Sequence, residues 1–426
     1  MKKLLTLSTI AFAIISCTKT QFTAPAVSTG SANFTKFVSV GNSLTQGYMD
    51  GGLYFYGQSN SYPSIIAKQA QDANFNQPMV TGNGSGYIHL AFINNQLSPI
   101  QPSDSTFGPP INPDPSWVNW GTSLQSNSYC NLGISGITLD NTVALTPTEA
   151  LINSTICANN PYGRFMSFGS FASPKVYIDN LRTCGATFFT CWLGSNDVLG
   201  YATAGGVPTV VVTFLGKITL NAITSPAIFA QKYDSILTVF NKMGAKGVCA
   251  TIPDVTSIPF FNTVPSYVTV NGNKQFLYIR TAAGVRQATT QDHILLTAYD
   301  SVLAGKGLTA SNPLSNPLVL DASEVDSIEI ALAQYNSSIK SLAASFGFPV
   351  VDMYQYLGSL QQSIYVDGIT FNRTFIQGGA IGLDGIHPDA RGYALVANQF
   401  IQVINASFGA TIPPADVTQF RGVLFP

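Results

Sequence analysis

The chain has 426 residues, of which 46% are hydrophobic and only 10% are charged, and its formal net charge is −1. This length is enough for one large α/β domain with insertions or for two smaller domains. No run of lysine and arginine could neutralise a series of phosphates, so the composition argues against a nucleic-acid partner.

The N-terminus carries the features of an export signal. Two lysines precede an apolar stretch over residues 4–15, which is too short to span a bilayer comfortably. Ile14-Ile15-Ser16-Cys17 resembles the processing box of bacterial lipoproteins, in which the cysteine is acylated and becomes the new N-terminus. We therefore expect residues 1–16 to be a signal peptide, Cys17 to carry the lipid, and residues 17–33 to form a flexible tether. The expected location is the bacterial cell envelope, at the outer membrane, facing either the periplasm or the exterior.

Strand-like and helix-like segments alternate along the rest of the chain, which predicts a parallel sheet covered by helices on both faces. The expected strands cover residues 37–40, 187–193, 248–252 and 349–352. The expected helices cover residues 225–243, 322–346 and 390–408.

The folded domain is predicted over residues 34–410, with a C-terminal tail at 411–426. Two long segments inside it, at about 50–131 and 253–320, show little periodicity. Both are too long for simple connections, so we expect them to form lids, pocket walls or a small cap.

Five cysteines follow Cys17, and this odd number allows at most two disulfides and leaves one free thiol. They are Cys130, Cys157, Cys184, Cys191 and Cys249. No pair has the spacing of metal ligands and the chain has three histidines, so neither a metal site nor a cofactor is predicted.

A serine follows the first expected strand directly, in the sequence Gly41-Asn42-Ser43-Leu44. A serine at such a turn can present its hydroxyl at the carboxyl edge of a parallel sheet, where ligands bind in open α/β folds. Serine beside glycine is also common in ordinary turns, so these residues alone do not decide between the two interpretations.

Near the other end of the chain stands Asp384-Gly385-Ile386-His387-Pro388. A neutral histidine can take a proton from serine near pH 7, and a carboxylate fixes its tautomer. The alternative is a surface turn with an incidental histidine. His89 and His293 lack a comparable acidic turn, and we interpret both as structural.

Acyl transfer also needs hydrogen-bond donors for the oxyanion. Gly194-Ser195-Asn196-Asp197 follows the second strand, where the Asn196 amide is a neutral donor. In the segment 131–136, Gly136 has a bare backbone N–H that a ligand can approach closely. Asparagine and glycine are frequent in turns of every kind, so each segment is weak evidence by itself.

Together these segments resemble the four blocks of the SGNH hydrolases, the GDSL esterase/lipase superfamily, which occur in this order. The resemblance spans roughly residues 37–408. It implies a catalytic triad of Ser43, Asp384 and His387, and an oxyanion hole made by the backbone N–H groups of Ser43 and Gly136 and the side chain of Asn196. With the alternation of strands and helices, it predicts a flavodoxin-like three-layer sandwich with a central parallel sheet and long loop insertions near the active site. One departure is Asn42, which replaces the aspartate of the GDSL motif.

The function that these residues favour is hydrolysis of carboxylic esters through an acyl-enzyme intermediate. The substrate would be a small-molecule, lipid or glycan ester, and the membrane would be contacted through the N-terminal lipid. A carbohydrate O-deacetylase and an acyltransferase remain open alternatives within the same fold, and a non-catalytic surface binding lipoprotein is a further one. The scattered histidines argue against a metal-dependent phosphoesterase. The oligomeric state is open.

Overall fold

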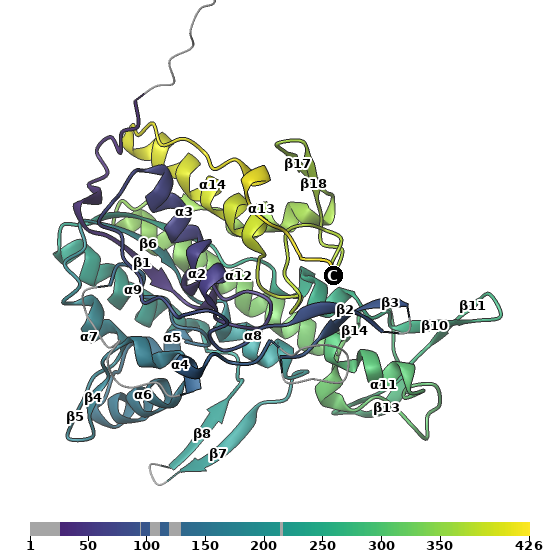
Figure 1. Cartoon of the computed structure of the whole chain (residues 1–426). Coiled ribbons are helices and arrows are strands. Elements are labelled where there is room, and N and C mark those ends of the chain that lie inside the picture. Colours follow the sequence, from purple (N-terminus) through teal and green to yellow (C-terminus); the bar gives the residue numbers. More distant parts are fainter. Residues whose placement is uncertain (1–25, 94, 103–110, 119–128, 214–215) are drawn as a thin grey trace, which may run out of the picture.

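Four parallel strands form the central sheet, in the order β1-β6-β9-β16 (Figure 1). Their bounds are β1 Phe37–Gly41, β6 Phe188–Trp192, β9 Lys246–Ala250 and β16 Val350–Val351. A parallel bridge between Ser39 and Asn131 extends the sheet beyond β1. If the segment at Asn131 is numbered 2, because it follows β1 in the chain, the order of the five segments across the sheet is 2-1-3-4-5. This is the doubly wound order of flavodoxin-like folds. The computed structural model thereby confirms the predicted fold class.

The structure describes residues 26–93, 95–102, 111–118, 129–213 and 216–426. The predicted signal peptide and Cys17 lie outside these residues, so export and lipid attachment stay predictions. No helix in the described ranges has the length and apolar character needed to cross a membrane.

Helices cover both faces of the sheet. Those on one face are α3 Tyr62–Gln69 and α14 Ala390–Phe408, and those on the other are α5 Leu139–Thr142, α7 Tyr177–Leu181, α9 Pro226–Lys242 and α12 Ala322–Ser345. The strands divide their side chains between the two cores with a period of two, so that Phe189 and Cys191 face α9 while Phe188 and Trp192 face α14. These two cores are the interfaces of a three-layer sandwich.

The remaining elements lie in the connections. The further helices are α1 Ser43–Gln46, α2 Phe55–Ser59, α4 Pro115–Val118, α6 Pro147–Asn159, α8 Asn196–Thr203, α10 Pro259–Asn262, α11 Tyr299–Leu303 and α13 Met353–Gly358. The further strands form antiparallel pairs: β2 His89–Ile93 with β3 Gln96–Ile100, β4 Gly169–Ser170 with β5 Ser173–Pro174, β7 Thr209–Thr213 with β8 Gly216–Leu220, β10 Tyr267–Val270 with β11 Asn273–Phe276, β12 Tyr278–Thr281 with β13 Gly284–Gln287, β14 His293–Ile294 with β15 Val319–Leu320, and β17 Ile364–Val366 with β18 Ile369–Phe371.

The three predicted helices agree with α9, α12 and α14 to within one residue. The strand predicted at 248–252 is displaced, because β9 begins at Lys246 and includes Gly247, neither of which carries a strand-like side chain. A Cβ atom on Gly247 would lie 2.2 Å from the Phe189 ring, so close packing against β6 requires the glycine.

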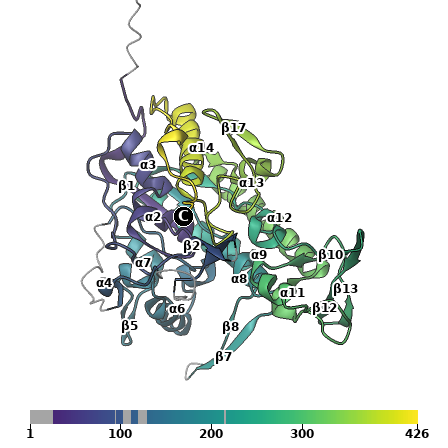
Figure 2. The same ribbon diagram turned by 45° about the vertical axis from the view of Figure 1, so that its right-hand side comes forward.

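The two predicted insertions differ in character. The first contains the hairpin β2–β3 but also α3, whose Tyr62 and Ile66 are buried in the core under α14, so this segment is partly a structural layer. The second forms three short β pairs around a small core of its own. A hairpin that the sequence analysis did not predict, β7–β8, projects from the body of the molecule in both views (Figures 1 and 2).

Both predicted flanking segments pack against the domain. Ser31 donates a backbone hydrogen bond to Phe408 (2.8 Å) and Thr411 donates one to Ser28 (2.8 Å). The flexible tether predicted at 17–33 therefore extends too far, since its described part is tied to the end of α14. In the predicted tail, Ile412 and Val417 are buried against the same helix layer.

All five described cysteines are buried and free. The two disulfides that the count allows are therefore not formed. Cys191 and Cys249 are neighbours on adjacent strands, where they fill core positions. Among the described residues no group of three or more His, Cys, Asp or Glu side chains could hold a metal ion.

Asp389 caps α14 from a buried position. One carboxylate oxygen accepts the Gly392 backbone N–H (2.8 Å), and burial raises the pKa of Asp389 to about 7. Between about pH 4 and pH 7 the Asp389 carboxyl is therefore protonated in the folded chain but ionised in the unfolded chain. The free energy of unfolding then falls as the pH rises through this range.

We expect the unfolding free energy to fall between pH 5 and pH 7.5, with Asp389 contributing on the order of 2 kcal/mol of that change. Asp389→Asn keeps an oxygen for the cap and removes the titration. Urea unfolding at the two pH values should therefore show a smaller difference for the variant. An equal difference in both proteins would contradict the assignment.

Candidate active site

Ser43 lies at the turn between β1 and α1. Asn42 caps this short helix through Oδ1, which accepts the Leu44 backbone N–H at 3.0 Å. A Cβ atom on Gly41 would lie 1.9 Å from Thr45 Oγ1, so the tight turn requires glycine there. Ser43 is thereby held at the carboxyl end of β1 with 6% of its surface exposed.

His387 and Asp384 lie in the loop before α14, and the fold brings them to Ser43. His387 Nε2 is 2.8 Å from Ser43 Oγ, and His387 Nδ1 is 2.7 Å from Asp384 Oδ2. These are hydrogen-bond distances between a hydroxyl, an imidazole and a carboxylate in series. The arrangement can remove the hydroxyl proton of Ser43 while the carboxylate stabilises the imidazolium that forms.

Asp384 also holds the backbone around it. Its Oδ1 accepts the N–H groups of Ile386 and His387, both at 2.9 Å, and its Oδ2 accepts the N–H of Gly51 at 2.9 Å. Burial raises the pKa of Asp384, but the nearby His387 and these hydrogen bonds outweigh it, so the net pKa lies below the usual range. The carboxylate is therefore ionised at neutral pH.

The segment after α1 supports the loop, and the sequence analysis did not identify it. The Tyr48 ring lies 4.6 Å from the His387 ring, centroid to centroid, and its hydroxyl donates to the Gly51 carbonyl (2.6 Å). Asp50 Oδ1 accepts the Leu383 backbone N–H at 2.7 Å. Gly51 has φ of 72°, so the Asp50-Gly51 pair is a turn that the sequence could have indicated.

The three predicted oxyanion donors are placed differently. Ser43 and Asn196 line the same cavity, and Asn196 begins α8, where its Nδ2 donates to the Ile137 carbonyl at 2.9 Å. Gly136, at φ of 80°, is exposed in the turn just before Ile137 and is not among the residues that line the cavity.

Buried Asp197 connects the Asn196 segment to the Gly136 segment. Both of its oxygens accept the Leu139 backbone N–H, at 2.9 and 3.1 Å. Burial raises the pKa of Asp197 to about 7. The segment that contains Gly136 is thus fixed to the start of α8.

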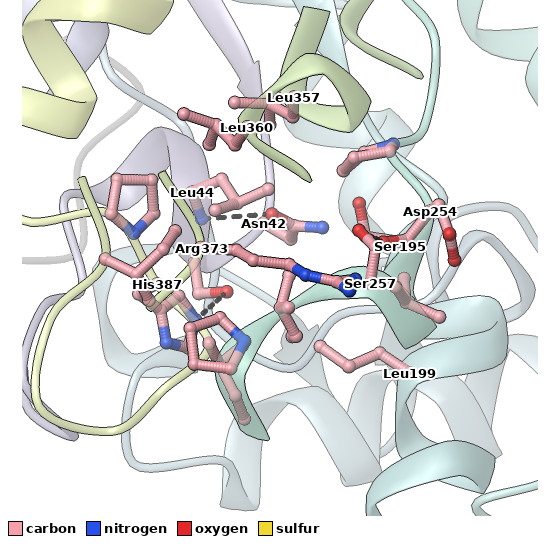
Figure 3. Close-up of a pocket in the computed structure, with 18 of the residues that line it drawn as sticks. Asn42, Leu44, Ser195, Leu199, Asp254, Ser257, Leu357, Leu360, Arg373 and His387 are labelled. Carbon is pink, nitrogen blue, oxygen red and sulfur yellow. Dashed lines mark hydrogen bonds between the residues drawn. The ribbon is translucent and has the colours of Figure 1, made fainter. Parts of the chain in front are cut away.

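Ser43 and His387 open onto a cavity that is partly continuous with solvent (Figure 3). Its wall is mainly apolar. The apolar residues are Leu44, Leu199, Pro253, Val255, Ile258, Pro259, Leu357, Leu360, Ile381, Ile386 and Pro388. An apolar wall with a few polar groups beside the Ser43 hydroxyl is the usual character of a site for an organic ligand.

The other two histidines lie elsewhere. His293 Nδ1 is 2.9 Å from the Phe261 carbonyl oxygen, and burial lowers the pKa of His293. His89 lies on β2, and neither of its ring nitrogens has a hydrogen-bond partner within the described ranges. Neither residue lines the cavity at Ser43.

No protein-family model and no curated protein matches the chain. Among solved structures, it is similar to an α/β hydrolase from the Lake Arreo metagenome, with 12% identity, 89% of this chain and 96% of that chain covered, and a TM-score of 0.36. It is also similar to a putative GDSL-like lipase from Parabacteroides merdae, with 10% identity, 88% of this chain and 94% of that chain covered, and a TM-score of 0.35. An acetyl-xylooligosaccharide esterase from Geobacillus matches with 11% identity, 88% of this chain and 96% of that chain covered, and a TM-score of 0.34. The fold assignment rests on the order of the strands in the sheet, and the site rests on the distances between its side chains.

Proposed function

We propose that the chain is an SGNH-type serine hydrolase that cleaves carboxylic esters through an acyl-enzyme intermediate. The observation that carries this proposal is the series of two hydrogen bonds from Ser43 through His387 to Asp384, at 2.8 and 2.7 Å, on the wall of an apolar cavity. Ser43 is the nucleophile, His387 is the general base and then the general acid, and Asp384 positions His387.

In the first half of the reaction Ser43 Oγ attacks the carbonyl carbon of the ester while His387 Nε2 takes the hydroxyl proton. The tetrahedral intermediate collapses when the alcohol leaves with that proton. Water then attacks the acyl-Ser43 ester, again with His387 as base, and releases the carboxylic acid.

The proposed oxyanion donors are the Ser43 backbone N–H and the Asn196 amide, which both line the cavity; Gly136, the third donor that the resemblance implies, lies outside this lining. The Ser43 N–H lies at the start of α1, where backbone N–H groups have no partner inside the helix. The Asn196 amide carries two hydrogens, so it can bind an oxyanion with one while the other stays bonded to Ile137. Such donors contribute most of the electrostatic stabilisation in acyl transfer.

The apolar wall favours an acyl or alcohol group with several carbon atoms. We therefore expect the full-length protein, in a non-ionic detergent, to hydrolyse p-nitrophenyl butyrate and hexanoate with higher kcat/KM than the acetate. Each methylene buried against the wall contributes up to about 0.8 kcal/mol, or roughly fourfold.

Initial rates on the series from acetate to palmitate test this. Activity confined to the acetate would favour the O-deacetylase alternative. If no ester is hydrolysed above the rate in buffer by a folded protein, the proposed function is contradicted.

A further inference from the structure

Arg373 is the one arginine or lysine that lines the cavity next to Ser43 among the described residues. It follows β18, and its backbone N–H donates to the carbonyl of Leu360 at 3.2 Å, which ties the segment to the cavity wall. Figure 3 shows its side chain extending into the pocket below Leu357 and Leu360. The cavity that it enters is lined mainly by apolar side chains.

No carboxylate within the described ranges forms an ion pair with Arg373. The acidic residue in the same cavity, Asp254, uses its Oδ1 to accept the backbone N–H and the hydroxyl of Thr256, at 2.9 and 2.7 Å. Because a planar guanidinium in an apolar cavity is well suited to bind an anion, the arrangement around Arg373 suits an anion brought by a ligand.

Two more polar groups in the cavity lack protein partners. Asn42 is fully buried, and its Oδ1 is occupied by Leu44, but its Nδ2 has no acceptor among the described residues. The Ser195 hydroxyl, on a residue that is 4% exposed, has none either. In Figure 3 the Asn42 amide nitrogen points toward the side of the pocket where Ser195 lies. Buried donors without acceptors are costly unless a ligand completes them.

We propose that Arg373, Asn42 and Ser195 form a subsite for an anionic group of the ester substrate, a carboxylate or a phosphate. All three side chains can donate hydrogen bonds, and such an anion offers only acceptors, which a guanidinium binds through two parallel bonds. This inference rests on the proposed function and adds its substrate class: esters that carry a negative charge beside the bond to be cleaved.

The test compares matched esters with the full-length protein in a non-ionic detergent. 4-Acetoxybenzoate and 4-acetoxyphenyl phosphate carry the charge on the alcohol side, and 4-acetoxybenzamide is the neutral reference. p-Nitrophenyl hydrogen adipate carries it on the acyl side, with p-nitrophenyl hexanoate as reference. We expect at least one anionic ester to have a higher kcat/KM than its neutral reference. Arg373→Gln should lower the ratio of these two kcat/KM values, anionic over neutral, by about 10- to 100-fold, as for a lost charge-assisted hydrogen bond.

Two variants separate the subsite from other effects. Arg182→Gln removes a positive charge that is paired with Asp179 on the surface, and it should leave the ratio unchanged. Asp254→Asn should leave the ratio unchanged or raise it, because it removes a negative charge from the same cavity. The phosphate and benzoate arms show which anion is preferred.

The inference is overturned if Arg373→Gln does not change the ratio, if Asp254→Asn lowers it equally, or if every anionic ester is disfavoured. Hydrolysis of the neutral esters tests the proposed function separately, so a failure of the subsite is not confused with a failure of the triad.

Discussion

Replacing Ser43 by alanine is expected to lower kcat/KM for p-nitrophenyl esters by about 10⁴-fold or more. The hydroxyl is the group that forms the acyl-enzyme, and the cavity offers His387 no other hydroxyl at the 2.8 Å distance of Ser43 Oγ within the described ranges. The residual rate would come from the oxyanion donors acting on water. Initial rates of the parent and the variant, with active-site burst measurements, check this.

A matched control is Ser338→Ala at a half-buried position of α12, whose hydroxyl bonds only within the helix, to the Gln334 carbonyl. It should keep the parental rate. Thermal unfolding of both variants establishes that they are folded. A Ser43→Ala protein that is folded and retains more than a tenth of the activity would contradict the role of Ser43.

The second large effect is expected for Asp384→Asn, which should lower kcat by about 10²- to 10⁴-fold with little change in KM. Asp384 accepts four hydrogen bonds: from the backbone of Gly51, Ile386 and His387 and from His387 Nδ1. An asparagine amide must direct two N–H bonds toward some of these donors, so it either disturbs the loop or selects the wrong tautomer of His387.

Steady-state kinetics on the neutral butyrate ester separate these effects, because a lost tautomer lowers kcat while a collapsed cavity raises KM. Asp254→Asn makes the same chemical change elsewhere in the cavity and should leave kcat within about twofold, since Asp254 contacts Thr256 rather than His387. If Asp384→Asn lowers kcat by less than tenfold, Asp384 does not position the imidazole.

Local patterns were sufficient to predict much of the fold. The start of α14 follows from Pro388 just before it, and the continuous apolar run of β6 marks a central strand. Where the local signal is weak the prediction was displaced, as at Lys246 and Gly247, whose place in β9 depends on packing against Phe189.

The parts of the site that the sequence did not indicate depend on contacts between distant residues. The Gly51 N–H reaches Asp384 across 333 positions of the chain, and Tyr48 contacts the His387 ring. Arg373 lies after a short hairpin with no motif around it. Ser43 and His387 could be proposed because their neighbours form short recognisable turns, whereas a supporting residue has no such signature until the fold places it.

The most direct test of the account is to identify the residue that becomes covalently modified. Incubation of the full-length protein with diethyl p-nitrophenyl phosphate, followed by peptide mass spectrometry, should show one diethylphosphoryl group on Ser43, in proportion to the loss of esterase activity, and none in Ser43→Ala. Modification of another residue in proportion to that loss, or full inhibition with Ser43 unmodified, would contradict the assignment of Ser43 as the nucleophile.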